Sequence, residues 1–285
     1  MKTARRVLLT RRKRTAFSAA EGKKFKISLV QADIGLPTDS SGNVSKGCSD
    51  HYCMRRLLLV AGVLFMVTSC EMGPEKHDLL LITHQFDFSE SDHGWSGDFA
   101  DYPVGDSVAY GLYFGHDLLP ANLGGKKALK MSGTNYSDDL FMFLKKKIGG
   151  LEPFTAYEVA FQIKFATNAG KDNLGVGGSP GESVYLKAGA APIEPVKLAV
   201  NGYYQMNIDK GNQLSGGQHM VLIGNVATPT PTYDYSVVER NNGASFTATT
   251  NANGELWLVV GTDSGFEGTT TLYYTSITIL LTLAE

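Results

Sequence analysis

The chain has 285 residues, and its formal net charge of −2 conceals two regions of opposite charge. Residues 1–69 hold 13 Lys/Arg against 4 Asp/Glu, a net charge of +9, whereas residues 70–285 hold 13 against 24, a net charge of −11. Binding of nucleic-acid phosphates requires a positive surface, so the acidic charge of the longer region argues against nucleic acid as a partner.

A short apolar run, Leu57–Val67, follows the basic pair Arg55–Arg56 and leads through two small residues to Cys70. A basic start, an apolar run of about a dozen residues and small residues at the end are the layout of a secretory signal peptide. The run is shorter than the about 20 apolar residues that a transmembrane helix needs. The sequence therefore predicts a signal peptide at residues 54–69.

The ending Val67-Thr68-Ser69-Cys70 resembles the lipobox of bacterial lipoproteins. In that family the cysteine thiol is lipidated and the chain is cut just before it. The resemblance implies that Cys70 carries acyl chains such as palmitate and anchors the protein in the bacterial outer membrane. Because Cys48 and Cys53 precede the cut, the mature chain would hold no disulfide, thiol nucleophile or cysteine-based metal site.

Residues 70–78 form a polar tether after the predicted cut. Glu71 and Glu75 loosely resemble the acidic surface-export signals of Bacteroidetes lipoproteins, which implies display on the outer side of the membrane.

A signal peptide is read at the start of a chain, yet 53 residues precede Met54. We expect residues 1–53 to be an upstream region translated from a wrong start; the alternatives are a genuine disordered extension or a nucleic-acid-binding arm. The arm would use the basic cluster Arg11–Arg14, which no aromatic or periodic pattern accompanies.

From Leu79 onward, short apolar runs alternate with Gly, Pro, Asn, Asp and Ser, and no long window has helical periodicity. This pattern predicts an all-β fold, an antiparallel β-sandwich formed by one domain at residues 79–285. In Tyr157–Phe165 the alternate residues from Tyr157 onward are apolar, which predicts one face packed on a core. The expected strands are Leu79–Phe88, Val108–Phe114, Ala128–Ser132, Asp139–Leu144, Ala156–Ala166, Val184–Ala188, Tyr203–Ile208, His219–Val226, Tyr233–Glu239, Ser245–Thr250, Glu255–Val260 and Thr270–Leu283.

The first strand ending Gln85–Phe88, the loop reaching Gly94–Trp95 and the last strand Leu272–Ile279 resemble the layout of jelly-roll carbohydrate-binding modules. The resemblance implies that the first and last strands pair and that the domain binds a glycan. Members often hold a structural calcium ion through an Asp leading the last strand. Thr275 and Ser276 occupy that place here, a departure from the pattern.

A loop is expected at Gly261–Gly268, between a strongly apolar strand and the last one. Asp263 and Glu267 have three open interpretations: a loop whose side chains satisfy backbone donors, oxygen ligands for a sugar or for calcium with Asp138 as a further ligand, or a carboxylate pair for glycoside hydrolysis. The glycine-rich stretch Leu174–Ser183 lacks the features of a phosphate-binding loop and is expected to be a structured loop.

Aromatic residues gather in or beside the expected loops, and rings with a polar tip suit the face of a sugar. For any one ring, packing in the core or against a neighbouring strand is the favoured interpretation. Trp95 and Tyr102 are the best candidates for exposure, and with Tyr136 they are the candidate ring contacts for a ligand. The other tyrosines of this kind are Tyr110, Tyr113, Tyr203, Tyr204, Tyr233 and Tyr235.

The sequence thus favours a membrane-anchored lipoprotein that binds carbohydrate without catalysis. The alternatives are a structural or adhesive surface protein with a protein partner, and, least favoured, a glycoside hydrolase or lyase.

Overall fold

The computed structural model describes residues 5–7, 81–136, 139–243 and 246–284. All of these described residues belong to one compact unit. The predicted signal peptide, Cys70, the tether and Asp138 lie outside the described residues. Within the described ranges no helix is long and apolar enough to cross a membrane; the helical element found there is the 3-10 turn η1 (Ala121–Leu123).

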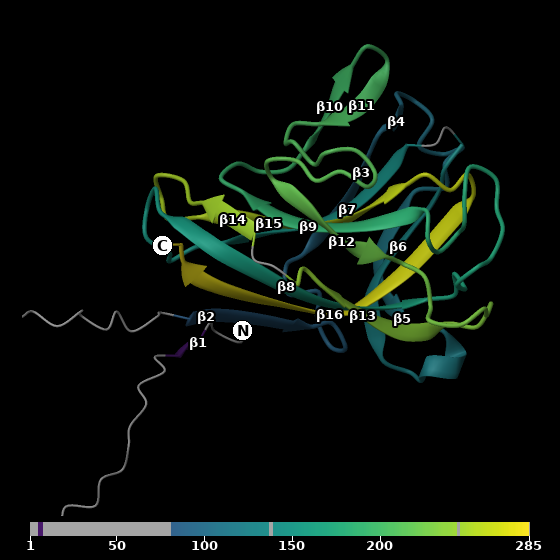
Figure 1. Ribbon diagram of the computed structural model, residues 1–285, viewed down its shortest axis with the longest axis horizontal. Coiled ribbons are helices and arrows are strands. Elements are labelled where there is room, and N and C mark those ends of the chain that lie inside the picture. Colours follow the sequence, from purple (N-terminus) through teal and green to yellow (C-terminus); the bar gives the residue numbers. More distant parts are fainter. Residues whose placement is uncertain (1–4, 8–80, 137–138, 244–245, 285) are drawn as a thin grey trace, which may run out of the picture. The chain divides into compact units, whose positions relative to one another are not determined.

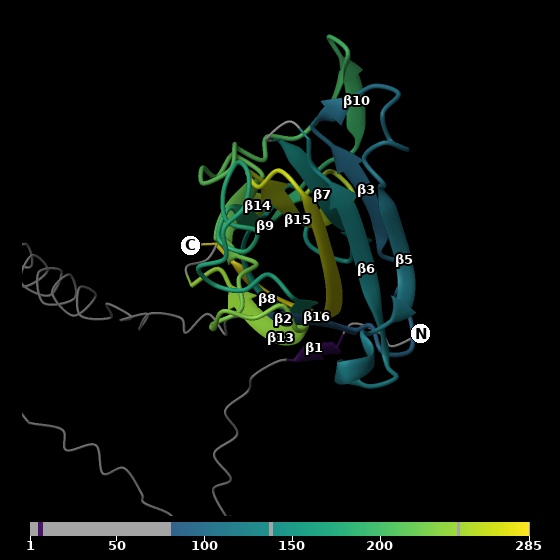
Figure 2. The ribbon, with the colours of Figure 1, turned by 90° about the vertical axis from the view of Figure 1, so that its right-hand side faces the viewer.

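Antiparallel strands form two main sheets, so the predicted all-β sandwich is confirmed (Figures 1 and 2). We call the larger one, with eight strands, sheet A. Its strands are β1 (Arg5–Val7), β2 (Leu81–Asp87), β5 (Tyr113–Leu118), β6 (Lys127–Thr134), β8 (Ala156–Thr167), β13 (Ser236–Asn241), β14 (Phe246–Thr249) and β16 (Thr269–Leu283).

The long last strand β16 organises sheet A. It pairs with β8 along one side and with β6 and then β2 along the other, and its register shifts between Tyr274 and Ser276. Thr278 lies opposite Gln85 in the β16–β2 pair. The predicted pairing of the first strand of the domain with the last is therefore confirmed.

The second sheet, sheet C, has five strands in the order β12-β9-β15-β7-β3. These strands are β3 (Ser96–Ala100), β7 (Leu140–Ile148), β9 (Val184–Ala191), β12 (Met220–Asn225) and β15 (Leu256–Ser264). A separate three-stranded sheet contains β4 (Tyr102–Pro103), β10 (Lys197–Val200) and β11 (Tyr203–Met206).

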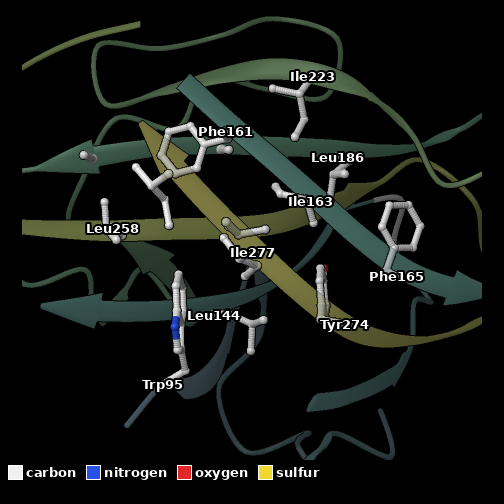
Figure 3. Packing of buried hydrophobic residues seen from close by; sticks show 14 of the residues in the cluster. Trp95, Leu144, Phe161, Ile163, Phe165, Leu186, Ile223, Leu258, Tyr274 and Ile277 are labelled. Carbon is white, nitrogen blue, oxygen red and sulfur yellow. The ribbon is translucent and has the colours of Figure 1, made fainter. Parts of the chain in front are cut away.

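The core lies between the inner faces of sheets A and C (Figure 3). Phe161, Ile163 and Phe165 of β8 are buried, as the alternation in the sequence predicts, and Leu186 of β9 and Leu258 of β15 belong to the same cluster. Apolar residues at every second position of a strand fall on one side of the sheet, and burying that side supplies most of the driving force for folding.

The outer face of sheet C is also covered. The covering segment, residues 192–219, connects β9 to β12 and contains the hairpin β10–β11. Its Ile208 packs in a second buried cluster with Phe141, Phe143 and Val259. At Gly189 a side chain would collide with the carbonyl oxygen of His219, so glycine permits the chain to approach β9 closely there.

Two predictions of strands are wrong around residues 96–114. Residues 104–111 form turns: Tyr110 N donates to Asp106 O, and Gly111 has a positive φ of 56°. Val108 is exposed there and does not pack on the core. The strand begins later, at Tyr113. The edge strand β3 (Ser96–Ala100) was not predicted, because Ser, Gly and Asp within it are typical of turns.

Candidate functional site

Asp263 lies in a strand, contrary to the loop expected at Gly261–Gly268. Residues 261–264 continue β15, opposite residues 140–143 of β7. The covering segment folds over this part of the sheet, and the side chain of Asp263 is fully buried. Burial in this position means that Asp263 does not face solvent or a substrate, so the hydrolase interpretation has no support here.

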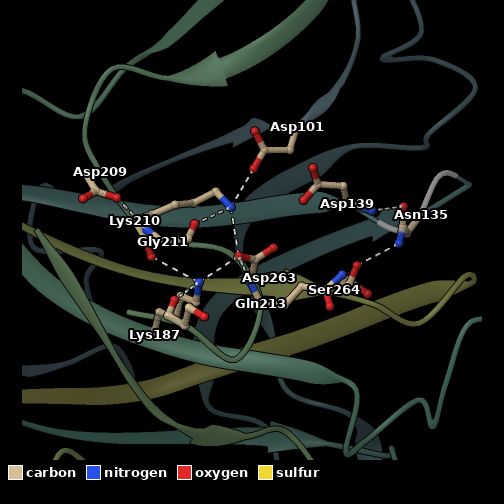
Figure 4. A network of polar contacts seen from close by, with 11 residues as sticks. Asp101, Asn135, Asp139, Lys187, Asp209, Lys210, Gly211, Gln213, Asp263 and Ser264 are labelled. Carbon is tan, nitrogen blue, oxygen red and sulfur yellow. Dashed lines mark hydrogen bonds and ion pairs between the residues drawn. The ribbon is translucent and has the colours of Figure 1, made fainter. Parts of the chain in front are cut away.

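A buried ion network surrounds Asp263 (Figure 4). Its Oδ2 atom accepts from Lys187 Nζ at 2.9 Å, Lys210 Nζ at 2.8 Å and the backbone N–H of Gln213 at 2.9 Å. Lys210 also pairs with Asp101 at 2.8 Å, and Lys187 is as fully buried as Asp263. Because two of these residues lie in the covering segment, the network fastens that segment to sheet C.

The charges of this network are coupled. Burial acts to raise the pKa of Asp263, but the ammonium groups of Lys210 and Lys187 outweigh it and hold the pKa below the usual value. Burial acts to lower the pKa of Lys210, and the carboxylates of Asp263 and Asp101 outweigh it and raise the pKa. Burial raises the pKa of Asp101, and Lys210 offsets this in part. Asp263 and Lys210 are therefore held as an ion pair.

Carboxylate oxygens of Asp101, Asp139 and Asp263 lie within 4.8 Å of one another. Calcium takes six to eight oxygen ligands, and three carboxylates could supply some of them. Here two ammonium groups already contact Asp263. Like charges repel, so this arrangement fits an internal ion network better than a cation site. Glu267, predicted as a calcium ligand beside Asp263, is not part of the group.

The expected exposure of Trp95 and Tyr102 is wrong. Trp95 is 3% exposed and its ring packs edge-on against Phe86 and Phe88, with centroids 5.5 and 6.2 Å away. Tyr102 is 1% exposed and packs beside Tyr204 of the hairpin. Both rings close off apolar parts of the molecule, so neither presents a face to a ligand.

Tyr136 is 61% exposed, and its ring packs edge-on against Tyr110. Glu267 is partly buried, and its backbone N–H donates to the carbonyl of Val176 at 2.9 Å, which joins the glycine-rich loop to the start of β16. Ligand contact by Tyr136 and Glu267 stays a prediction.

Exposed tyrosine rings do gather on the outer face of sheet A. Tyr113 of β5, Lys130 of β6 and Tyr273 of β16 lie on neighbouring strands, and the ring of Tyr235 packs edge-on against Tyr273 with centroids 5.4 Å apart. Lys130 Nζ lies 5.2 Å from the ring centre of Tyr113 and 5.6 Å from that of Tyr273. We call these four residues the tyrosine face.

The orientation of Tyr113 follows from its neighbours along β5. A Cβ at Gly115 would collide with the ring of Tyr113, so glycine makes room for that ring to lie along the strand. The Tyr113 hydroxyl donates to Asp117 at 3.0 Å, and this bond raises the pKa of the tyrosine. Tyr113 is 44% exposed, so part of a fixed ring remains open to solvent.

Hydroxyl pairs continue the tyrosine face along β6 and β16. Ser132 pairs with Thr271, and Thr134 pairs with Thr269, each at 2.7 Å between oxygens. Alternate residues on a strand lie about 7 Å apart on one side of the sheet, so Thr269, Thr271 and Tyr273 form a row. The row offers hydroxyl groups and a ring on one rigid surface.

A pocket of about 160 Å³ adjoins this row at the start of β16. Tyr233, whose ring is 79% exposed, lines it together with Asn168, Asn173 and Thr270. Thr270 is 6% exposed, and its hydroxyl has no hydrogen-bond partner among the residues that the structure describes. Thr271 belongs both to the pocket and to the row, so the two are continuous.

A larger hollow of about 350 Å³ lies over β8, β13 and β16, lined by Gln162, Thr278 and Leu280 among others. The aromatic ring in its lining, Phe161, is 2% exposed. The amide of Asn242, also in the lining, bridges the backbone of β8, accepting from Phe161 N and donating to Val159 O. The hollow therefore lacks the exposed ring that the tyrosine face provides.

Sequence reasoning missed Tyr273 and Lys130, and it named Tyr113, Tyr233 and Tyr235 among the loop aromatics without selecting them. Alternation along Thr269–Tyr273 places Thr269, Thr271 and Tyr273 on one side, a signal that was available in the sequence. Pairing of β16 with β6 and β8 was not available, and that pairing brings the rings together.

No protein-family model matches the chain, and no curated protein matches its sequence. Solved structures with related folds are distant. A candidate sugar-binding protein from Bacteroides thetaiotaomicron is 11% identical with a TM-score of 0.34, over 70% of this chain and 92% of that one. The K1 cleaved adhesin domain of Lys-gingipain from Porphyromonas gingivalis W83 is 11% identical with a TM-score of 0.33, over 71% and 99%. TmCBM61, solved with β-1,4-galactotriose, is 10% identical with a TM-score of 0.28, over 65% and 87%. Similarities this low assign neither a ligand nor an activity to this chain.

Proposed function

We propose that this protein is a lipid-anchored envelope protein whose β-sandwich binds carbohydrate, without catalysis, at the tyrosine face. The observation that carries the proposal is a group of partly exposed rings: Tyr113 and Tyr273 lie on sheet A beside hydroxyl pairs, and Tyr235, just before β13, packs against Tyr273. The C–H face of a sugar stacks on an aromatic ring, and its hydroxyl groups both donate and accept hydrogen bonds. A rigid surface loses little conformational entropy on binding.

The contrast with the outer face of sheet C supports this placement. There the aromatic residues Phe141 and Phe143 are buried under the covering segment, so they cannot stack on a ligand. On the tyrosine face, by contrast, the described part of the chain leaves Tyr113 44% exposed.

The test is a glycan-array screen of the full chain with Tyr113→Ala, Tyr273→Ala and, as a matched control, Tyr113→Phe. We expect saturable binding that the alanine variants weaken by about tenfold or more, while Tyr113→Phe keeps the ring and most of the affinity. An empty array with folded protein would overturn the carbohydrate proposal. Runs with calcium and with chelator test the calcium predicted from the sequence at Asp138, Asp263 and Glu267.

The anchor is tested separately. If Cys70 is lipidated, Cys70→Ala should release the protein from the outer-membrane fraction and remove the mass of the acyl chains. Unchanged fractionation of the variant would contradict the anchor and leave the glycan proposal intact.

A second candidate function, adhesion to a protein, rests on the hairpin β10–β11. Leu198, Val200 and Tyr203 are 49%, 37% and 46% exposed on this short hairpin, and exposed apolar groups favour protein contacts. Leu198→Ser with Val200→Ser should leave glycan binding unchanged. If the wild-type protein binds no glycan but adheres to cells, and the double variant abolishes that adhesion, the adhesive function replaces the carbohydrate proposal.

A further inference from the structure

The pocket beside the tyrosine face is concave, whereas the row of Thr269, Thr271 and Tyr273 is an open surface. Its volume of about 160 Å³ is below the about 300–1,000 Å³ of pockets for drug-sized ligands. It therefore suits a single sugar ring, whereas a longer stretch of polymer would need the open surface beside it.

The polar groups of the pocket are arranged for a neutral ligand that both donates and accepts hydrogen bonds. Asn173 donates a 3.3 Å bond to Thr232 O, and Thr269 and Thr271 share hydroxyl bonds with β6. The hydroxyl of Thr270 is buried and has no partner in the described part of the chain. A buried unpaired hydroxyl costs free energy that a ligand hydroxyl would recover.

Apolar residues form another part of the pocket lining. Tyr233, an exposed residue, lines the pocket, and Phe266 and Pro180 contribute apolar surface. Phe266 is fixed between Gly175 and Gly268, since a Cβ on either glycine would collide with its ring. The pocket is thus held in shape before any ligand binds.

Charge narrows the ligand class. Ten residues with described side chains line the pocket, and none of them is Asp, Glu, Lys, Arg or His. A carboxylate that enters such a site loses its hydration and finds no cation in return, which is strongly unfavourable. A uronic acid would therefore be rejected where the matching neutral hexose is accepted.

We propose that this pocket binds one neutral pyranose unit of a glycan whose neighbouring units lie along the tyrosine face, and that the Thr270 hydroxyl bonds to that unit. The inference rests on the proposed function, because the glycan reaches the pocket along the same row of Thr271 and Tyr273. It adds a substrate class, neutral rather than acidic sugars, and a residue that sets the specificity.

The experiment measures dissociation constants of the full chain for matched pairs of β-1,4-linked polymers: glucan with polyglucuronate, and mannan with polymannuronate. Each pair differs in the oxidation of C6, and running both pairs on Lys130→Gln as well separates the charge met in the pocket from the charge met at Lys130 on the tyrosine face. We expect the neutral member of the bound pair to bind at least about tenfold more tightly than its acidic counterpart.

Two variants examine the pocket itself. Thr270→Val should weaken binding by about three- to tenfold without lowering the melting temperature, because valine keeps the shape and removes an unpaired hydroxyl. Thr262→Val is the matched control: its hydroxyl is also buried without a partner in the described residues, but it lies on β15, outside the pocket lining. Tyr233→Ala removes an exposed ring and should also weaken binding.

The outcomes separate the two proposals. Equal affinity for the neutral and the acidic polymer overturns binding in the pocket. So does unchanged affinity in both Thr270→Val and Tyr233→Ala while Tyr113→Ala still weakens binding. Either result leaves the proposal for the tyrosine face intact. Loss of affinity in Thr262→Val equal to that in Thr270→Val overturns the specific role of Thr270. A folded wild-type chain that binds no glycan on the array and no polymer overturns the proposed function and the pocket together.

Discussion

Both sheets carry aromatic rings on their outer faces, but the rings on sheet C are buried and those on sheet A are partly exposed. On sheet C, Phe141 and Phe143 lie beneath the covering segment, whose Lys210 is tied to Asp263. On sheet A, Tyr113 is 44% exposed and Tyr273 is partly exposed beside Tyr235, and each ring carries a hydroxyl. The residue types fit this difference in exposure. A phenylalanine ring is wholly apolar and is stabilised by burial, whereas a tyrosine ring can keep its hydroxyl in contact with water. Covered aromatics stabilise the molecule, whereas open ones are available for binding.

The largest effect is expected from breaking the ion network. Asp263→Ala would leave Lys187 buried and without its carboxylate, which should lower the free energy of unfolding by about 3–5 kcal/mol. The matched control is Asp117→Ala, which breaks the Lys130–Asp117 pair at the surface and should cost at most about 1 kcal/mol. Urea unfolding of both variants measures the difference, and equal losses would refute the contrast between the faces.

A smaller loss is expected from weakening the apolar contact of the covering segment. Ile208→Ala removes a side chain that is 4% exposed and should lower the free energy of unfolding by about 2–4 kcal/mol. Val108→Ala, at a residue 89% exposed, provides the comparison and should change stability by less than about 0.5 kcal/mol. If Ile208→Ala proves as mild as Val108→Ala, the covering segment does not stabilise sheet C.

The pH dependence of stability should report the same network. The pKa of Asp263 is lower in the folded protein than its ordinary 3.8, so below that value the unfolded chain binds a proton that the folded chain resists. Its contribution to stability is therefore present above pH 3.8 and is lost as the pH falls through the folded pKa. The stability difference between wild type and Asp263→Asn should shrink over that window, and a constant difference would show that Asp263 does not titrate in this way.

The smallest effect on stability, and a large one on binding, is expected at the tyrosine face. Tyr113→Ala removes a ring that rests on the surface, so the free energy of unfolding should change by less than about 1 kcal/mol. Thermal unfolding of the variant used in the glycan screen measures this. A loss above about 2 kcal/mol would mean that the ring is structural, and any weaker glycan binding would then need another explanation.

Much of the fold follows from local patterns in the sequence. The alternation in Tyr157–Phe165 predicted a strand with one buried face, and Phe161, Ile163 and Phe165 are indeed buried. The resemblance of the two ends of the domain predicted the pairing of β2 with β16. The first signal lies within nine consecutive residues, and the second rests on the order of the elements along the chain.

The site was harder to predict, because its contacts join distant residues. Gly261 and Asp263 are typical of a loop, but the strand continues through them since Lys187, 76 positions away, pairs with Asp263 in the interior. Trp95 and Tyr102 lie in a stretch rich in Gly and Asp, yet the aromatic rings that bury them come from other elements. A single sequence does not reveal those neighbours.

The place of β16 after its partner strands in the sequence has a consequence for how the protein is made. Its residues Thr269–Leu283 supply the shared partner of β2, β6 and β8. A ribosome delivers the N-terminus first, so β2, β6 and β8 are synthesised before the strand that joins them. Contacts between such distant strands also form slowly. Sheet A is therefore completed only once β16 has been synthesised, whereas the strands of sheet C pair with one another and do not need it.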